Sequence, residues 1–152
     1  MKHIQPPDKI PDDPSRKIFL AGSIEMGSAE NWQDKFINGV KDLDVIILNP
    51  RRDHWDTTWS HKSIEFRQQV EWELHAQNIA DSIVFYFDPA TKSPITLLEL
   101  GLNINGNIFV CCPEGYWRKG NVDIVCEQHD ICVLDTLEDL IEYIRKLYGC
   151  NR

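Results

Sequence analysis

Apolar residues gather in five short, nearly uninterrupted runs along the chain, and stretches with helical periodicity separate these runs. The runs are rich in β-branched residues, as in VIIL and IVFYF, which is typical of parallel strands that are covered on both faces. The predicted strands span residues 17–24, 44–49, 82–87, 107–112 and 131–134. The predicted helices span residues 29–42, 62–80, 94–105, 120–129 and 136–148.

This alternation predicts an α/β fold, a doubly wound sandwich with a five-stranded parallel sheet and right-handed crossovers. Five strands suit the order 2-1-3-4-5, in which ligands bind beyond the carboxyl ends of the strands, at the switch point between strands one and three. Four polar loops that follow strands are therefore the candidate ligand-binding segments. They are AGSIEMG, NPRRDHWDTTW, DPATKSP and PEGYWRKGN.

The chain of 152 residues is long enough for one domain. Its first fifteen residues carry four of its eight prolines and no apolar run, so we expect a flexible N-terminal tail over residues 1–15 and a catalytic domain over residues 16–150. The tail lacks the apolar stretch of a signal peptide, and no segment approaches the roughly 18 apolar residues of a membrane helix. We therefore expect a soluble, cytoplasmic protein.

Acidic residues outnumber basic residues, with 24 Asp and Glu against 16 Lys and Arg, which gives a formal net charge of −8. Such a surface repels the phosphates of nucleic acids and of anionic membranes. We expect neither a nucleic-acid polymer nor a membrane as a partner, whereas a single nucleotide can still bind through a local basic cluster.

The five cysteines are expected to be reduced thiols. Cys126, His129 and Cys132 lie three residues apart, but His129 falls at the end of a predicted helix and Cys132 in the next strand. A shared tetrahedral site is not expected, so neither a metal nor a cofactor is predicted. A flavin is disfavoured because AGSIEMG lacks the Ser/Thr-rich phosphate cradle that is expected after the first strand.

Glu99 occupies an unusual position on a predicted helix. The segment SPITLLELG opens this helix with Ser93 as its N-cap and Pro94 at the first helical position. At about 100° per residue, Glu99 shares the face of Ile95 and lies near Leu102, on the side expected to pack on the sheet. A lone buried charge is costly, so a carboxylate there needs partners or a function. The alternative is a Glu at the helix edge whose charge reaches water.

Glu73 repeats this arrangement on the preceding helix, where Phe66, Val70 and Leu74 form the predicted apolar stripe. The alternative is again a Glu at the margin of the stripe. Two acidic groups near one switch point are the usual equipment for cleaving a glycosidic bond, with one as nucleophile and the other assisting the leaving group. The two pKa values should then differ, because the nucleophile acts ionised and a proton donor acts protonated.

Six stretches of the chain match one known family. They are FLAGSIEMG, ENWQ, LNPRRDHWD, QQVEWEL, ADSIVFYFDPATKSPITLLELG and CCPEGYWRKGNVD. On these stretches, which span roughly residues 18–125, the chain resembles the nucleoside 2-deoxyribosyltransferase-like family. The resemblance implies a flavodoxin-like fold, assembly as a homodimer or larger homo-oligomer, and a small-molecule nucleoside or nucleotide as the partner.

The resemblance also implies roles for single residues. The Glu of the ELG motif attacks the anomeric carbon of deoxyribose in relatives, and this role maps onto Glu99. An acidic residue that handles the base lies eight positions before the Asp that opens the third strand. Here these two positions are Glu73 and Asp81, although relatives usually carry Asp at the first, and Asp81 is counted with the substrate-binding candidates. Phe19 stands where many transferases have a Tyr that contacts the nucleophile, so that hydrogen bond is expected to be absent.

Residues expected on the phosphate side favour opposite substrates. Related deoxynucleoside 5′-monophosphate N-hydrolases carry Ser at the position of Ser93, and Ser23 matches another of their serines, which favours a nucleotide at the helix N-terminus. Their phosphate-binding Arg, however, corresponds to Glu25, whose carboxylate repels a phosphate. Arg51 or Arg52 of the next loop is hypothesised to compensate.

The loop NPRRDHWDTTW carries further candidates. Arg51 or Arg52 is expected to bind an anion, and Asp53 to orient an Arg or to bond a base edge. Trp55 or Trp59 is expected to stack beside the base. The alternative is a structured lid that is held by buried Trp rings and surface ion pairs.

Asn121 is the candidate for a residue that, in relatives, reaches the active site of the neighbouring subunit from this segment. The alternative is that Asn121 caps the N-terminus of the predicted helix. The histidines His54, His61 and His75 show no nucleophile-activating pattern and are expected to be structural.

These features together predict cleavage or transfer of the N-glycosidic bond of deoxynucleosides or their 5′-monophosphates through a covalent intermediate on Glu99. Deoxyribose is the expected sugar. Two alternatives remain open, a deoxynucleoside 5′-monophosphate N-hydrolase with water as acceptor and a non-catalytic nucleotide sensor. Ser93 favours the hydrolase, Glu25 favours the transferase, and the intact ELG motif argues against the sensor.

Overall fold

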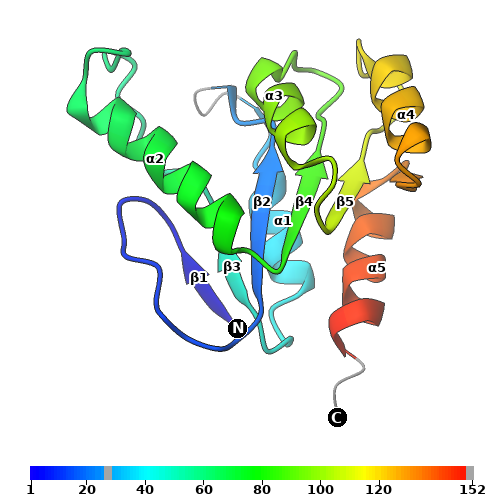
Figure 1. The fold of residues 1–152 in the computed structure, drawn as a ribbon, viewed down its shortest axis with the longest axis horizontal. Helices are drawn as coiled ribbons and strands as arrows, with labels where there is room; N and C mark the ends of the chain where they lie inside the picture. Colours follow the sequence, from blue (N-terminus) through cyan, green and yellow to red (C-terminus); the bar gives the residue numbers. More distant parts are fainter. Residues whose placement is uncertain (26–28, 150–152) are drawn as a thin grey trace.

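The computed structural model describes residues 1–25 and 29–149, and its centre is a parallel sheet with helices on both faces (Figure 1). The strands are β1 (Lys2–Ile4), β2 (Lys17–Gly22), β3 (Ile46–Leu48), β4 (Ser82–Tyr86), β5 (Ile108–Cys111) and β6 (Val133–Leu134). The helices are α1 (Trp32–Gly39), α2 (Ile64–Ile79), α3 (Pro94–Asn103), α4 (Lys119–Gln128) and α5 (Leu137–Gly149). Within the described residues, no helix has the length and apolar character needed to cross a membrane.

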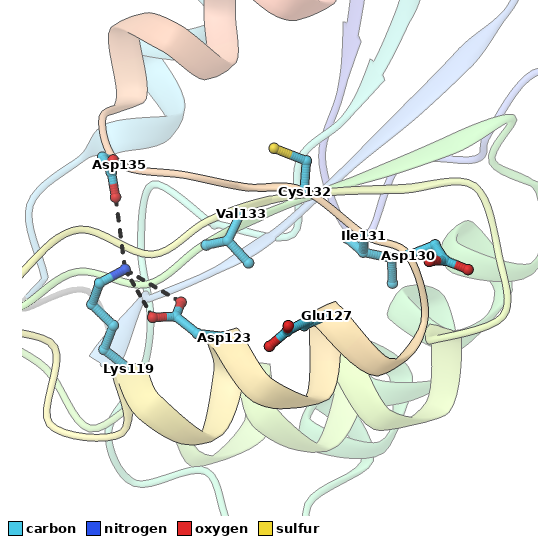
Figure 2. Close-up of a pocket in the computed structure, with 8 residues that line it drawn as sticks. All are labelled: Lys119, Asp123, Glu127, Asp130, Ile131, Cys132, Val133 and Asp135. Carbon is cyan, nitrogen blue, oxygen red and sulfur yellow. Dashed lines mark hydrogen bonds and ion pairs between the residues drawn. The ribbon is translucent and has the colours of Figure 1, made fainter.

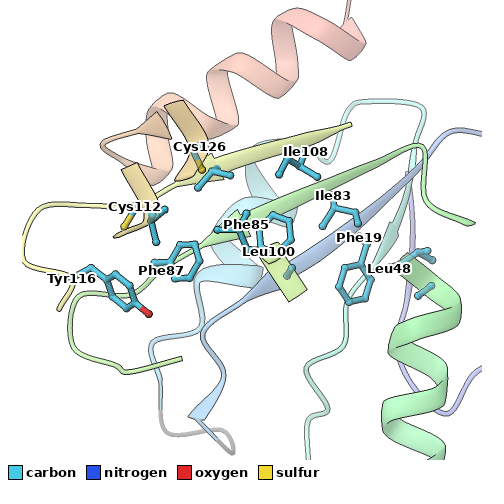
Figure 3. Close-up of a cluster of buried hydrophobic side chains, with 14 of the residues drawn as sticks. Phe19, Leu48, Ile83, Phe85, Phe87, Leu100, Ile108, Cys112, Tyr116 and Cys126 are labelled. Carbon is cyan, nitrogen blue, oxygen red and sulfur yellow. The ribbon is translucent and has the colours of Figure 1, made fainter. Parts of the chain in front are cut away.

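Successive residues of each strand point to opposite faces of the sheet, and each face carries its own apolar core. Phe19 and Phe85 belong to the core beneath α2, α3 and α4, which is drawn in Figure 3. Their neighbours Ile18 and Val84 belong to the core beneath α1 and α5. Both faces of the strands are therefore buried, which explains the continuous apolar runs in the sequence.

The sheet has six strands in the order β1-β3-β2-β4-β5-β6, so the prediction of five strands in the order 2-1-3-4-5 was wrong. The five predicted strands all form, and they keep the predicted order among themselves. The additional strand is β1, which adds to the outer edge of β3 in parallel. The α/β architecture with helices on both sides of a parallel sheet fits a flavodoxin-like fold.

Strand β1 lies in the segment that was expected to be a loose tail. Lys2 pairs with Ile46 in parallel register, Ile10 is buried in the core, and the Trp72 indole N–H donates to the backbone oxygen of Asp8 at 2.9 Å. A three-residue strand at the sheet edge, in which Ile4 alone packs against the apolar core, is too short to leave an apolar pattern in the sequence. That is why hydrophobic periodicity did not reveal this strand.

The end of β2 is fixed by a close approach between backbone and a tryptophan ring. A Cβ on Gly22 would lie 2.5 Å from the Trp32 ring and 2.6 Å from the backbone oxygen of Tyr86, so only glycine fits there. The Trp32 indole N–H donates to the backbone oxygen of Ser23 at 3.1 Å. This packing holds the residue after β2 at the carboxyl edge of the sheet.

Helices α2 and α3 turn other faces toward the protein than the apolar periodicity predicted. Ile95 and Leu102 are 60% and 64% exposed, and Leu74 is 50% exposed, whereas Glu99 is only 9% exposed. The prediction that Glu99 shares a buried face with Ile95 and Leu102 was wrong, because these helices line a polar region at the edge of the sheet. The buried polar side chains of α2 and α3 are Gln69, Gln77, Thr96 and Glu99.

Candidate active site

Three hydroxyl groups meet at the carboxyl ends of β2 and β4, which form the switch point of the sheet. Ser23 follows β2, and Thr91 and Ser93 lie in the loop between β4 and α3. The Oγ of Ser23 lies 2.5 Å from the Oγ of Ser93 and 2.9 Å from Oγ1 of Thr91. The structure thus brings Ser23 and Ser93 together and adds Thr91, which the sequence analysis did not single out.

Glu25 places a carboxylate at the beginning of α3. Ser93 is the N-cap of this helix and Pro94 follows at the first helical position, but the Ser93 side chain makes no capping bond because it belongs to the hydroxyl cluster. The backbone N–H of Ser93 instead donates to Oε1 of Glu25 at 2.8 Å. The positive end of the helix dipole favours a negative charge at this place.

The carboxyl group of Glu99 is buried between α3 and α2. Gln77 is 7% exposed, and its Nε2 donates to Oε1 of Glu99 at 2.6 Å. Asn103, one turn further along α3, donates to Oε1 of Gln77 at 2.8 Å and to the backbone oxygen of Glu99 at 2.9 Å. This small network joins the two helices at Glu99.

Glu73 lies on α2, one helical turn before Gln77, and is partly buried. Nε2 of Gln69 donates to Oε1 of Glu73 at 2.6 Å and to the backbone oxygen of Pro50 at 2.9 Å. The Nε of Arg52 donates to Oε1 of Gln69 at 2.5 Å. Gln69 therefore connects the Glu73 carboxylate to a cation in the loop after β3.

The charge of Glu73 affects the ionisation of Glu99. Burial, and then the negative charge of Glu73, raise the pKa of Glu99 to about 8, and the hydrogen bond from Gln77 opposes this rise. Burial raises the pKa of Glu73 to about 6, while the hydrogen bond from Gln69 and the charge of Arg52 lower it. The higher pKa therefore belongs to Glu99, the residue expected to act in its ionised form. The charged neighbour of Glu99 is another carboxylate, whereas the charged neighbour of Glu73 is Arg52. Around neutral pH the pair holds one proton.

Arg51 ties two loops together. Its guanidinium donates to the backbone oxygens of Ala29 and Glu30 at 2.9 and 3.1 Å, which joins the loop after β3 to the segment before α1. Asp53, two residues further, is exposed. The structure therefore gives Arg51 a structural contact and places Asp53 on the surface of the loop.

Arg52 and two tryptophans form the part of this loop nearest to Glu73. The guanidinium of Arg52 lies 5.1 Å from the centre of the Trp59 ring, and Trp55 packs edge-on against Trp59 with centroids 5.2 Å apart. The indole N–H of Trp55 is buried and has no hydrogen-bond partner among the described residues. A buried donor without a partner is rare in folded proteins.

Asp81 and Asn121 lie away from the carboxyl pair. Asp81 precedes β4 at its amino end, where its Oδ2 accepts the backbone N–H of Lys17 at 2.7 Å. It therefore stabilises the opposite edge of the sheet, which corrects its assignment as a substrate-binding residue. Asn121 is exposed within α4, whose N-cap is Arg118, so the alternative of Asn121 as the cap was wrong.

A cavity of about 410 Å³ adjoins the hydroxyl cluster. Its lining includes Glu25, Glu30, Asp88, Thr91 and Lys92, so carboxylates outnumber cations there. An anionic ligand would meet three carboxylates at this place and a single lysine. The cavity therefore suits a neutral or cationic group next to the hydroxyls.

A second cavity, of about 470 Å³, lies between α4 and the segment that leads through β6 (Figure 2). Lys119 lies 3.3 Å from Asp123 and 3.7 Å from Asp135 across it. Neither Glu73 nor Glu99 lines this cavity, so we do not assign it to the carboxyl pair.

Cys126, His129 and Cys132, whose spacing raised the question of a metal site, lie in different surroundings. Cys126 is buried in the apolar core, whereas His129 and Cys132 are exposed. Within residues 1–25 and 29–149, no group of three His, Cys, Asp or Glu side chains is placed to hold a metal ion.

Sequence reasoning missed the residues that contact the carboxyl pair, namely Gln69, Gln77 and Asn103. Gln69, Glu73 and Gln77 follow one another at intervals of four, which places them on one face of a helix. This polar stripe was visible in the sequence, but the apolar stripe beside it was taken as the buried face.

The parallel sheet with helices on both faces, together with the two carboxyl groups on α2 and α3, defines a flavodoxin-like α/β protein with acidic groups suited to glycosidic chemistry. The profile of the family described as nucleoside 2-deoxyribosyltransferase like matches residues 15–116, and the chain belongs to this family. Membership supports a general role in glycosyl transfer or hydrolysis with small nucleoside substrates.

The structural comparison agrees with this fold. A crystal structure of a conserved protein from Enterococcus faecalis V583 is similar, with 16% sequence identity and a TM-score of 0.61. The similarity covers 88% of this chain and 99% of that chain. No curated protein matches the chain.

Proposed function

We propose that this protein cleaves or transfers the N-glycosidic bond of a deoxynucleoside through a covalent glycosyl intermediate on Glu99. The observation that carries the proposal is that Glu99 is buried on α3 against Gln77 of α2, with the carboxylate of Glu73 one turn away on α2 and close enough to oppose the ionisation of Glu99. A buried carboxyl group beside a second carboxylate is costly to fold around, and a reaction that uses both groups accounts for it.

In this proposal the reactive form carries the single proton of the pair on Glu73. A carboxylate oxygen of Glu99 attacks the anomeric carbon, and the bond to the base nitrogen breaks with its electron pair leaving on the base. The base takes a proton from Glu73, or from a water molecule that Glu73 holds. A second base or water then attacks the same carbon and frees Glu99. A 2′-hydroxyl would crowd the nucleophile, which favours deoxyribose.

The surroundings of Glu25 favour a free nucleoside over a 5′-monophosphate. A phosphate at the beginning of α3 would compete with the Glu25 carboxylate, which already accepts the N–H of Ser93, and would meet Asp88 nearby. The second candidate is a deoxynucleoside 5′-monophosphate N-hydrolase with water as acceptor. The hydroxyl groups of Ser23 and Ser93 at this helix end favour it, because they are suitable donors to a phosphate.

The base is proposed to lie against the loop after β3. Arg52 lies close to Glu73 through Gln69, and the indole N–H of Trp55 is a buried donor without a partner in the described part of the chain. An acceptor on the base edge would satisfy this donor, and the Trp59 ring offers a face for stacking.

We also propose a homo-oligomer. Exposed apolar side chains lie on α2 and α3 at Ile64, Leu74, Ile95, Leu98 and Leu102, and several exposed apolar side chains on neighbouring helices favour a protein interface. Asn121 is exposed on the neighbouring helix α4 and is proposed to reach the site of an adjacent subunit. Light scattering after gel filtration measures the subunit number.

The experiment that tests the reaction is chromatography of purified protein with each deoxynucleoside and each deoxynucleoside 5′-monophosphate, with and without a second free base. We expect base release from nucleosides by the wild-type protein and by Glu65→Gln, whose side chain is exposed in the first turn of α2. Glu99→Gln should abolish the release and retain binding. A new nucleoside that forms with the added base selects the transferase, and release without exchange selects the hydrolase.

Release that persists in Glu99→Gln would contradict the covalent role of this residue. Binding without release from every substrate would favour the non-catalytic sensor.

A further inference from the structure

The carboxylate of Glu99 receives its hydrogen bond from a residue that the family resemblance does not point to. Phe19, at the position of the expected tyrosine, is fully buried in the apolar core and has no group that donates a hydrogen bond (Figure 3). The donor is Nε2 of Gln77, which reaches across from α2 at 2.6 Å. The two residues are 22 positions apart in the chain, so this contact depends on how α2 packs beside α3.

Asn103 determines which way the amide of Gln77 points. A glutamine side chain has one end that donates and one that accepts, and the two ends are set by the groups they face. The Asn103 side-chain N–H donates to Oε1 of Gln77, so this oxygen faces Asn103 and the Nε2 end faces Glu99. Asn103 donates in addition to the backbone oxygen of Glu99, which fixes its own side chain.

We propose that Gln77 is a positioning residue for the nucleophile: its amide holds the Glu99 carboxylate in one orientation and favours its ionised form, and Asn103 keeps the amide turned the right way. This inference rests on the proposed function. Within residues 1–25 and 29–149, Gln77 is the one side chain that donates a hydrogen bond to the Glu99 carboxylate. The bond engages Oε1 and leaves Oε2 for attack on the anomeric carbon.

The physical reason is that a donor to a carboxylate binds the charged form more strongly than the neutral form. Glu99 needs this support because burial and the charge of Glu73 both oppose its ionisation. Leucine at position 77 has a similar volume and cannot donate, so it removes the hydrogen bond while it fills the same space.

The test compares the wild-type protein with Gln77→Leu and, as a matched control, Gln68→Leu, which changes an exposed glutamine of the same helix. We expect Gln77→Leu to lower kcat by about tenfold or more with a much smaller change in KM, because one charge-assisted hydrogen bond is lost in the transition state. The alkaline limb of its kcat/KM profile, which follows the titration of Glu99, should move to higher pH by about one unit. Gln68→Leu should behave as the wild type.

A second measurement does not depend on turnover. Infrared titration follows the protonated carboxyl signal that disappears in Glu99→Gln, and Gln77→Leu should shift the titration of this signal upward. If Gln77→Leu does not fold, Asn103→Leu provides the same test, with a smaller shift in the same direction. An unchanged titration and an unchanged pH profile would overturn the role of Gln77. A shifted titration in a protein without base release would sustain the contact and overturn the proposed reaction instead.

Discussion

Replacing Glu99 with glutamine is expected to stabilise the folded protein at alkaline pH. Burial and the charge of Glu73 raise the pKa of Glu99 from 4.5 to about 8 in the folded state. Below pH 4.5 the carboxyl group is protonated in both the folded and the unfolded chain, so the substitution has little effect on stability at such pH values. As the pH rises above 4.5, the unfolded chain releases the proton and the folded chain retains it, so the folded state loses stability until the pH passes about 8.

The interval between the two pKa values of Glu99, 4.5 and about 8, gives the size of the expected change in the free energy of unfolding. At about 1.4 kcal/mol per pH unit it corresponds to an upper bound of about 5 kcal/mol. Water that reaches the site and small movements of the charged groups reduce such penalties in real proteins, so we expect Glu99→Gln to gain about 2 kcal/mol at about pH 8.5. The glutamine retains an oxygen that accepts the hydrogen bond from Gln77, so packing changes little.

The assay is urea denaturation followed by tryptophan fluorescence at about pH 5, 7 and 8.5, with the free energy of unfolding extrapolated to water. The wild-type protein, Glu99→Gln and the exposed control Glu65→Gln are compared. The difference between Glu99→Gln and the wild type should widen steadily toward alkaline pH, while the control runs parallel to the wild type. A difference that is the same at all three pH values would refute the raised pKa of Glu99 in the folded protein.

Two further predictions concern activity. The kcat/KM profile for base release should be bell-shaped, rising through about pH 6 and falling through about pH 8. The reason is that the reactive form needs one proton on the pair of Glu73 and Glu99. A flat profile across this interval would contradict that requirement. Glu25→Gln should raise kcat/KM for 5′-monophosphates relative to nucleosides by about tenfold, because it removes a negative charge at the beginning of α3, and equal changes for both substrate classes would argue against this role.

The positions of the five predicted strands followed from the sequence because a strand buried on both faces must be apolar at every position. Their order among themselves agrees with the order that suits five strands in a doubly wound fold, although the complete sheet has a sixth strand. Strand β1 could not be predicted in this way, because it has three residues and only Ile4 among them packs against the apolar core, so no apolar run marks it.

The faces of α2 and α3 needed the tertiary structure. Periodicity locates an apolar stripe but does not say what it packs against, and here Leu74, Ile95 and Leu102 are at least half exposed. The polar residues beside them turn toward the site, which is the reverse of what an isolated amphipathic helix suggests.

The sequence by itself determined the type of fold, the edge of the sheet where ligands are expected, and the two carboxylates proposed for the reaction. These depend on local patterns and on motifs within a few residues of one another. Only the tertiary structure decided that Gln77 and Asn103 hold Glu99, that Glu25 sits on the N–H of Ser93, and that Asp81 belongs to the opposite edge. Such contacts join residues far apart in the chain, and their geometry arises from the packing of whole elements, which no local pattern encodes.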